Sequence, residues 1–430
     1  MHRKRKNPLE ATSVRIMACF VCGLAALFYC YEFFLRAVPS VMIPELMEAF
    51  KINASHIGVL SAFYYYAYTP MQLPVGILMD RYGPRELLTG MVLMCTLGAF
   101  LFANTTSLYV AEIGQFLMGF GSAFAFVGVL KLAANWLPQR HFALASGLTT
   151  TLGMLGAILC DNALIHFVHN VGWQQAWQIS GVVGIVLAIL IFFIVRDAPQ
   201  GIKLAQVEYR DWRHAWLGFK KVMRKKQFWI NGIIGGFLFL PTTAFAVLWG
   251  IDYLTQAFSL TSHDAGFGVS MIFLGWAIGG PISGWLSSTI GKRILPIQVG
   301  LVIAASLMFF ILFTSVGTNK WIMFNALFFF GIFSSVQILC FAIGREISPK
   351  QASGTAVAAT NFLVMLGGVV IPPIIGALLD MHWGTSTAKG AHSYSHVDYQ
   401  SALLVLPIGL LIALALTFFM KETHCKQSTR

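Results

Sequence analysis

The first long apolar run of the chain contains a carboxylate and a guanidinium one helical turn apart. Glu32 and Arg36 lie in the stretch YCYEFFLRAVP, residues 29–39. A charged group within an apolar helix is unfavourable unless it faces a protein interior or a water-filled cavity. The spacing of four residues places both groups, together with Tyr29, on one face of a helix. This face is therefore the first candidate for binding a small polar molecule.

An arginine beside an acid can couple anion binding to proton uptake. Arg36 keeps Glu32 ionised, and a substrate carboxylate that captured Arg36 would leave Glu32 free to take up a proton. The planar fork of arginine suits a carboxylate because it donates two parallel hydrogen bonds. The alternative is a structural ion pair in which Arg36 extends toward the lipid headgroups. The apolar run continues through residues 41–43, which keeps both charges below the surface and favours binding.

Other polar side chains interrupt later apolar runs. Glu112 and Gln115 share one face of a run, and Glu112 and Asp161 are rival sites for a proton. Each of these groups has a structural alternative, a hydrogen bond between two helices. The predicted substrate-binding and coupling residues are Tyr29, Glu32, Arg36, Glu112, Gln115, Asp161 and Asn361.

The second apolar run is rich in tyrosine. Tyr64, Tyr65 and Tyr66 are consecutive, so at most two of them can face the interior of a helical bundle. The remaining tyrosines are expected to pack elsewhere or to lie at a membrane interface.

The composition requires these runs to lie in a lipid bilayer. The chain has 430 residues, of which 57% are hydrophobic and only 11% are charged. A soluble protein of this size needs more charge on its surface, and a bilayer core of about 30 Å is crossed by about 20 apolar residues. We predict twelve spans, at residues 15–42, 55–78, 86–104, 107–131, 142–168, 173–195, 227–253, 264–288, 294–315, 320–344, 352–379 and 400–420.

Most basic residues fall on one predicted side of the bilayer. With the N-terminus in the cytoplasm, only Lys51, Lys320 and Lys389 of the 29 Lys and Arg residues lie outside, while Arg36 and Lys131 lie within spans. This asymmetry is the positive-inside bias, and it predicts that both termini are cytoplasmic. The net charge of +12 is therefore explained by topology, and no nucleic-acid partner is expected.

The longest polar stretch, residues 196–226, divides the spans into two sets of six. It is predicted to be a basic cytoplasmic linker between six-helix bundles at 1–195 and 227–430. The two bundles contain similar loop sequences, GILMDRYGPR at 76–85 and GWLSSTIGKR at 284–293. Two six-helix repeats around a central cavity are typical of alternating-access carriers. The predicted fold is an all-α membrane protein of twelve transmembrane helices in two pseudo-symmetric bundles.

The first of these loops, Gly76-x-x-x-Asp80-Arg81-x-Gly83-x-Arg85, resembles the signature of the major facilitator superfamily. It lies between the second and third spans, where that family carries it. The resemblance implies a cytoplasmic latch that joins the two halves when the carrier is open to the outside. Physically, Gly76 is expected to let helices approach closely, Asp80 to meet a helix N-terminus or an arginine, and Gly83 to permit a tight turn.

One position departs from the family pattern. Members often have an arginine four residues before the first glycine of a Gly-x-Gly in the fourth span, where it assists proton coupling. Here that motif is Gly119-Phe120-Gly121, and the arginine position holds Gln115. A neutral amide cannot tune a carboxylate by charge, so the departure shifts attention to Arg36 as the cation of the cavity.

The resemblance implies a monomeric secondary transporter of a small molecule in a bacterial inner membrane, driven by a proton gradient without a cofactor. The stretches YEFFLRAVP and SAFYYYAYTPMQLPVGILMDRYGPR resemble the phagosomal nutrient transporters of intracellular bacteria, which implies import of an amino acid or a nucleoside. The alternative is a proton-coupled exporter of drugs, metabolites or siderophores. The fifth span lacks the Gly-Pro pair of antiporters, which favours import. No catalytic, ATP-binding or metal-ligand motif is recognised, so we expect neither an enzyme nor a metal site.

Overall fold

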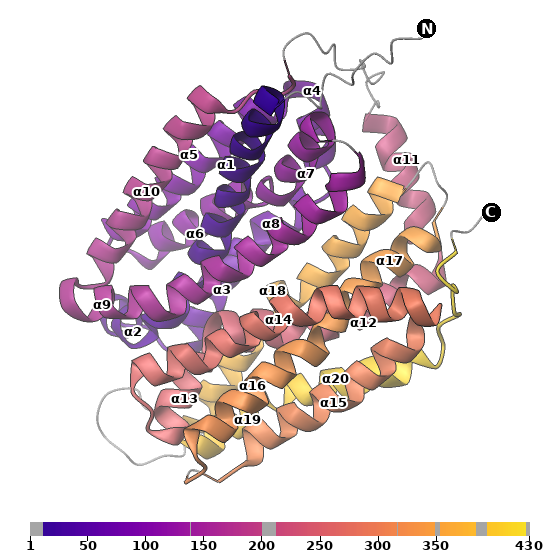
Figure 1. Ribbon diagram of the computed structural model, residues 1–430. Helices are drawn as coiled ribbons and strands as arrows, with labels where there is room; N and C mark the ends of the chain where they lie inside the picture. Colours follow the sequence, from indigo (N-terminus) through magenta and orange to yellow (C-terminus); the bar gives the residue numbers. More distant parts are fainter. Residues whose placement is uncertain are drawn as a thin grey trace, which may run out of the picture.

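The computed structural model describes residues 12–137, 139–199, 212–315, 317–348, 353–383 and 394–426, and their regular structure is helical throughout (Figure 1). The first half forms α1 (Thr12–Ala37), η2 (Val38–Val41), α2 (Ile43–Phe50), α3 (Ala54–Met71), α4 (Val75–Tyr82), α5 (Pro84–Ala103), α6 (Leu108–Ser122), α7 (Ala125–Trp136), α8 (Gln139–Leu159), η3 (Cys160–Leu164), α9 (Ile165–Val171) and α10 (Trp173–Ile194).

The second half forms α11 (Trp212–Met223), α12 (Lys226–Leu240), η4 (Pro241–Trp249), α13 (Gly250–Phe258), α14 (Ser262–Ile290), α15 (Ile294–Phe313), α16 (Lys320–Ser334), η5 (Ser335–Gln337), α17 (Ile338–Glu346), α18 (Ser353–Trp383), α19 (His396–Leu403) and α20 (Val405–Thr417). η3 and η4 are π-helical, whereas η2 and η5 are short 3₁₀ turns.

Eleven stretches of the described chain are long and apolar enough to cross a membrane. The predicted span 55–78 is the exception, because α3 is only 18 residues long and carries His56 and other polar residues besides its tyrosines. That span is also divided after Met71, where Pro74, which lacks a backbone N–H, precedes α4. The fold class predicted from the sequence, an all-helical membrane protein, is confirmed.

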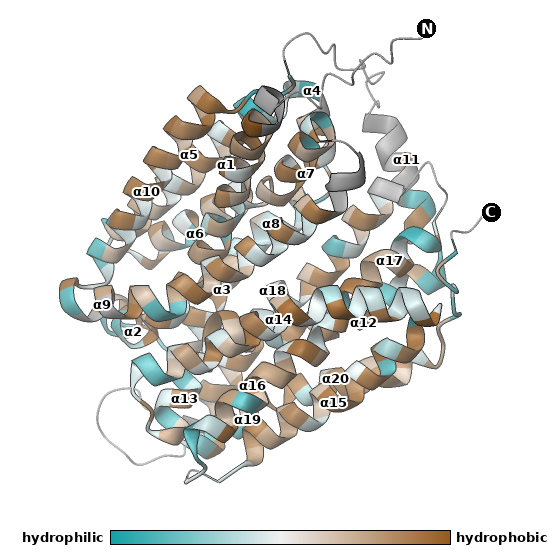
Figure 2. Cartoon of the chain, in the orientation of Figure 1, coloured by the Kyte–Doolittle hydropathy of each residue, from teal (hydrophilic) through white to brown (hydrophobic). Residues whose placement is uncertain are grey.

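Apolar side chains cover the outside of the molecule. Leu97 on α5 and Val186 and Phe193 on α10 are exposed, and Figure 2 shows both helices as predominantly hydrophobic. In water such a surface would be unstable, whereas in a bilayer it contacts lipid.

The helices of the two halves meet along α3 and α18, which run antiparallel beside each other (Figure 1). A side-chain carbon at Gly58 of α3 would lie 2.3 Å from the Pro372 carbonyl oxygen of α18, so only glycine permits this approach. One end of the bundle carries α2, α9 and α13, and we call it the α9 end. The opposite end carries α4 and α11, and we call it the α11 end.

At the α9 end, an acid of one half caps a helix of the other. Asp380 near the end of α18 accepts hydrogen bonds from the backbone N–H of Ala54, at 3.2 Å, and of Ser55, at 2.8 Å. The Ser55 hydroxyl and the Tyr394 hydroxyl also donate to this carboxylate. Asp380 therefore stabilises the first turn of α3 and fastens the two halves together.

The helix α11, which lies within the predicted linker 196–226, packs against protein. Val222 of α11 is fully buried in a small apolar cluster with Ala356 and Leu363 of α18, and Phe219 packs beside them. The predicted linker residues 200–211 lie outside the described chain.

Candidate functional site

Glu32 and Arg36 form an ion pair within α1. Arg36 Nη2 contacts Glu32 Oε1, Glu32 is fully buried and Arg36 is only 4% exposed. Tyr64 of α3 donates a hydrogen bond from its hydroxyl to the same carboxylate oxygen at 2.7 Å. The other oxygen, Glu32 Oε2, has no hydrogen-bond partner in the described part of the chain. The carboxylate thus keeps an unused acceptor inside the protein.

Four aromatic rings surround the Arg36 guanidinium. The Arg36 Cζ atom lies 4.7 Å from the ring centroid of Phe33, 5.3 Å from Tyr64, 5.8 Å from Tyr65 and 4.8 Å from Tyr68. Aromatic faces attract a cation without neutralising it, each contributing about 0.5–2 kcal/mol. The rings therefore hold the guanidinium in place and leave its positive charge to be balanced by Glu32.

We call the rings of Phe33, Tyr64, Tyr65 and Tyr68 around Arg36 the cage. This cage borders the second half of the chain. A side-chain carbon at Gly368 of α18 would lie 2.7 Å from the Tyr65 ring. Two turns away, the Asn361 side-chain amide donates a 2.8 Å hydrogen bond to the Gln72 amide oxygen of α3. Asn361, predicted as a substrate ligand, thus makes a hydrogen bond between the two halves, which is the structural alternative considered for the polar side chains of the spans.

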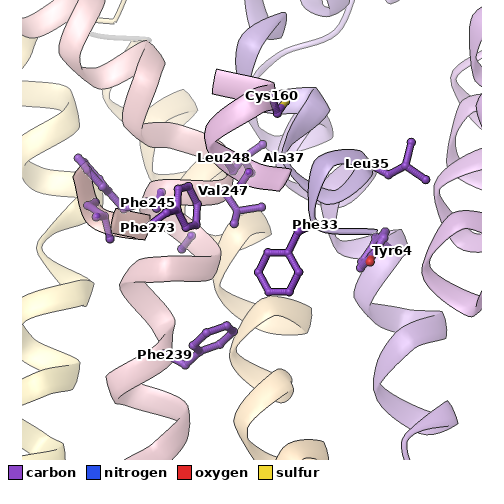
Figure 3. Close-up of a cluster of buried hydrophobic side chains, with 14 of the residues drawn as sticks. Phe33, Leu35, Ala37, Tyr64, Cys160, Phe239, Phe245, Val247, Leu248 and Phe273 are labelled. Carbon is purple, nitrogen blue, oxygen red and sulfur yellow. The ribbon is translucent and has the colours of Figure 1, made fainter. Parts of the chain in front are cut away.

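The cage adjoins an apolar cluster that joins the halves. Figure 3 shows the Phe33 ring of α1 directed toward Phe239 of α12 and Val247 of η4. Tyr29, another predicted site residue, packs its ring 5.0 Å from Phe33 and 5.1 Å from Phe126 of α7. The charged face of α1 therefore lies where both halves contribute side chains.

The structure separates the α6 candidates from the ion pair. Glu112 is partly exposed and Gln115 is buried, and among the described residues neither has a hydrogen bond or ion pair with Glu32. The Gln115 amide nitrogen has no partner within the described chain. One turn farther, a side-chain carbon at Gly119 would lie 2.0 Å from the Tyr64 carbonyl oxygen, so α6 packs directly behind the cage.

Asp161 lies at the α9 end, between the halves. It is fully buried in η3, where its Oδ2 atom is 3.5 Å from the Ser270 hydroxyl of α14. The neighbouring Asn162 donates a 2.7 Å hydrogen bond to the same hydroxyl. The structure thus places Asp161 in a separate polar cluster from Glu32.

The signature loop after α4 is held by the first half. Gly83 has φ +79°, and a side-chain carbon there would lie 2.8 Å from the Asp197 carboxylate. Asp197 accepts a 2.8 Å hydrogen bond from the Arg85 backbone N–H and so caps α5, while Arg85 Nε donates to the Phe192 carbonyl. Gly83 is glycine because both its turn and this carboxylate exclude a side chain.

The other loop residues make fewer contacts. Arg81 is exposed and lies over the Tyr82 ring, and the Asp80 side chain lies outside the described part of the structure. A side-chain carbon at Gly76 would meet no neighbouring atom within 4 Å. The prediction that Gly76 lets two helices approach closely is therefore wrong. The described hydrogen bonds from Arg85 of this loop to a distant segment are made with Phe192 and Asp197 of the first half.

The second loop has a buried partner that the sequence analysis missed. Arg293 Nη2 lies 2.8 Å from Glu346 Oε1, and both side chains are largely buried. The acid ends α17, far from Arg293 in the sequence. The available signal was an acid two residues beyond the predicted span 320–344, but the spacing of residues could not identify Arg293 as its partner.

The comparisons with known proteins agree with this arrangement. The family model described as Major Facilitator Superfamily matches residues 24–372 and 233–429. A solved structure of a bacterial homologue of the human lysosomal transporter Spinster, in an inward-facing and unoccupied conformation, shares the fold with a TM-score of 0.78. It is 16% identical and covers 94% of this chain and 96% of its own.

Two curated relatives extend over most of the chain. A probable sulfoacetate transporter of Cupriavidus necator is 24% identical over 379 residues, 84% of this chain and 87% of its own. A probable galactarate/D-glucarate transporter of Escherichia coli K12 is 23% identical over 401 residues, 86% of this chain and 88% of its own. The chain is a multi-pass membrane transporter rather than an enzyme, and it belongs to the Major Facilitator Superfamily.

Proposed function

We propose that the protein imports a small organic anion together with a proton by alternating access. The observation that supports this proposal is the buried Glu32–Arg36 pair, held by Tyr64 at the border of the two halves. In the proposed cycle residues 1–195 and 227–430 move against each other about the linker 196–226. Both termini are placed in the cytoplasm, so the α9 end, opposite to them, faces outward. The membrane is taken to be the bacterial inner membrane.

Charge balance favours this coupling. A buried carboxylate–guanidinium pair is neutral, and a second anion bound beside it would carry an uncompensated charge into a partly dry site. If Glu32 takes up a proton as one substrate carboxylate binds Arg36, that carboxylate replaces the charge of Glu32 beside the guanidinium, and the charge balance of the pair is kept. The unused Glu32 Oε2 atom is an acceptor at which this proton can bind.

The relatives support the choice of an anion. One is named for sulfoacetate and the other for galactarate and D-glucarate, and all three molecules carry carboxylates. These names do not favour the amino-acid and nucleoside branch that the sequence resembled. An amino acid also carries a carboxylate for Arg36, so it is included in the test below as a competing substrate.

Uptake into proteoliposomes tests the proposal. Radiolabelled sulfoacetate, D-glucarate, alanine and adenosine are offered with and without an inward proton gradient. For the accepted anion, Glu32→Gln should retain exchange but lose gradient-driven accumulation, because its amide cannot release a proton. Arg36→Lys should raise the apparent KM about tenfold or more, because the two parallel hydrogen bonds are lost.

Glu48→Gln is the matched control. Glu48 is an exposed acid on α2, so this variant should behave like the parent. Full accumulation by Glu32→Gln, or uptake of adenosine with no anion accepted, would contradict the proposal.

A further inference from the structure

A second buried carboxylate lies outside the cage, at the α9 end. Asp161 is fully buried, and its only hydrogen-bond donor in the described structure is Ser270, at a long 3.5 Å. Its Oδ1 atom has no partner among the described residues. Leaving a full negative charge in such a site is far more costly than burying the neutral acid.

The two halves both contribute to this site. Asp161 belongs to α8–η3 of the first half, whereas Ser270 belongs to α14 of the second. A side-chain carbon at Gly266 of α14 would lie 2.2 Å from the Asp161 carbonyl oxygen, so α14 rests directly on η3. The π-helical turn directs both Asp161 and Asn162 toward Ser270, and such turns are frequent at functional sites.

The elements packed against η3 bring no free cation to Asp161 among the described side chains. η2 has no titratable residue, and Arg36 of α1 is engaged by Glu32. The first turn of α14 has Asp264, which pairs with Lys320 at 3.0 Å. At the α9 end these elements also carry the titratable groups Cys160 and His263. α9 adds His166 and His169, and the side chains of these two histidines lie outside the described part of the structure.

We propose that Asp161 is a proton-binding site that gates the α9 end. With this end open, the ionised carboxylate is exposed to water, and it takes one proton from that water before α14 closes over η3. No other bond changes, and the proton returns to the same side when the end reopens. This proton is distinct from the one carried by Glu32, because it is bound and released on one face and is not transported.

The proposal relies on the proposed alternating-access function but not on its substrate or coupling acid. It predicts that alkaline pH opens the α9 end without any substrate. Because one proton is bound on closing, the ratio of open to closed molecules should rise by up to about tenfold per pH unit.

Electron-spin distance measurements on protein in nanodiscs test this gate. Spin labels are placed at the exposed positions Ala49 on α2 and Ser262 on α14, in a background without other cysteines. Between pH 5 and pH 9 the parent should shift from short to long distances. Asp161→Asn should stay short throughout, because its amide needs no proton, and Asp161→Glu should restore the pH dependence.

The controls separate this site from others. Glu48→Gln, which removes an exposed acid outside the proposed binding site, should titrate like the parent. The proposal would be overturned if the spin-label distance in the parent did not change with pH, or if it still changed with pH in Asp161→Asn. It would also be overturned if His166→Gln lost the pH dependence while Asp161→Asn kept it. If the α9 end opened with pH through Asp161 but uptake did not depend on a proton gradient, only the proposed proton coupling would be contradicted. If uptake was proton-driven but the α9 end did not respond to pH, only this inference would be contradicted.

Discussion

At the scale of single residues, Tyr64 makes the contact that links α3 to the ion pair. Its hydroxyl donates to Glu32 Oε1 at 2.7 Å and lies 3.5 Å from Arg36 Nε, while its ring centroid is 5.3 Å from the guanidinium. The hydroxyl stabilises the charged carboxylate, whereas the ring stabilises the cation. The two contributions can be separated because phenylalanine keeps only the ring.

We predict that Tyr64→Phe makes Glu32 easier to protonate. A hydrogen bond to a charged group is worth about 1.5–3 kcal/mol, so proton-driven uptake should reach half-maximum at a higher pH. The pH profile of anion uptake into proteoliposomes measures this displacement. Tyr66→Phe is the control, because the Tyr66 side chain is 37% exposed and its profile should match that of the parent. An unchanged profile for Tyr64→Phe would mean that its hydroxyl does not act on Glu32.

At the scale of elements, sequence reasoning located helices better than it located their partners. The apolar runs predicted the membrane helices because length and hydropathy are local properties. The spacing of Glu32 and Arg36 predicted their pairing because both lie on one helix. Of the three consecutive tyrosines, Tyr64 and Tyr65 are buried and Tyr66 is exposed, as helical periodicity required.

Contacts between distant elements could not be predicted in this way. Asp380 and Ala54 are 326 residues apart, and their hydrogen bond depends on how α18 packs against α3. The π-helical turn η3 and the pairing of Arg293 with Glu346 likewise depend on tertiary packing. Sequence periodicity assigns a residue to a face, but it does not state which helix covers that face.

The two halves repeat one capping device, and this repeat carries a pH-dependent prediction. Asp197 caps α5, and Glu422 accepts hydrogen bonds from the backbone N–H of Arg293 and Ile294 at the start of α15, at 2.8 and 2.9 Å. Burial raises the pKa of the Glu422 carboxyl, but these and other backbone N–H groups outweigh burial and lower it overall from its ordinary value of 4.5. The folded protein therefore favours the ionised form.

Glu422→Ala should destabilise the protein by about 1 kcal/mol at pH 7, the usual value of a lost helix cap. Because the folded-state pKa is lowered, the contribution of Glu422 is present above pH 4.5 and is lost as the pH falls through the folded value. Thermal unfolding in detergent at pH 7 and at pH 4 measures the difference. Glu48→Ala, which removes an exposed acid from α2, should unfold like the parent at both pH values. Equal destabilisation by Glu422→Ala at the two pH values would contradict a charged cap.

At the scale of the whole molecule, α3 and α18 form a continuous contact between the halves. Asp380 meets Ala54 at the α9 end, Pro372 meets Gly58, Gly368 meets Tyr65, and Asn361 meets Gln72 nearer the α11 end. The cage around Arg36 lies along this contact, since Tyr65 belongs to both. Opening the α9 end must therefore break the Asp380 cap while the contacts farther along α3 serve as the pivot.

We predict that Asp380→Ala shifts the protein toward the state that is open at the α9 end. The substitution removes the acceptor for the Ser55 N–H and one of two acceptors for the Ala54 N–H, whose other acceptor is the Tyr394 hydroxyl at 3.2 Å. The expected loss is about 1 kcal/mol, which corresponds to roughly a fivefold rise in the open-to-closed ratio. The distance distribution between spin labels at Ala49 and Ser262, recorded at one pH, measures this ratio. Asp398→Ala is the matched control, because Asp398 caps α19 through Ser395 within the second half. If Asp398→Ala opened the α9 end as much as Asp380→Ala, the effect would come from general loss of helix stability, and the cap between halves would not hold that end closed.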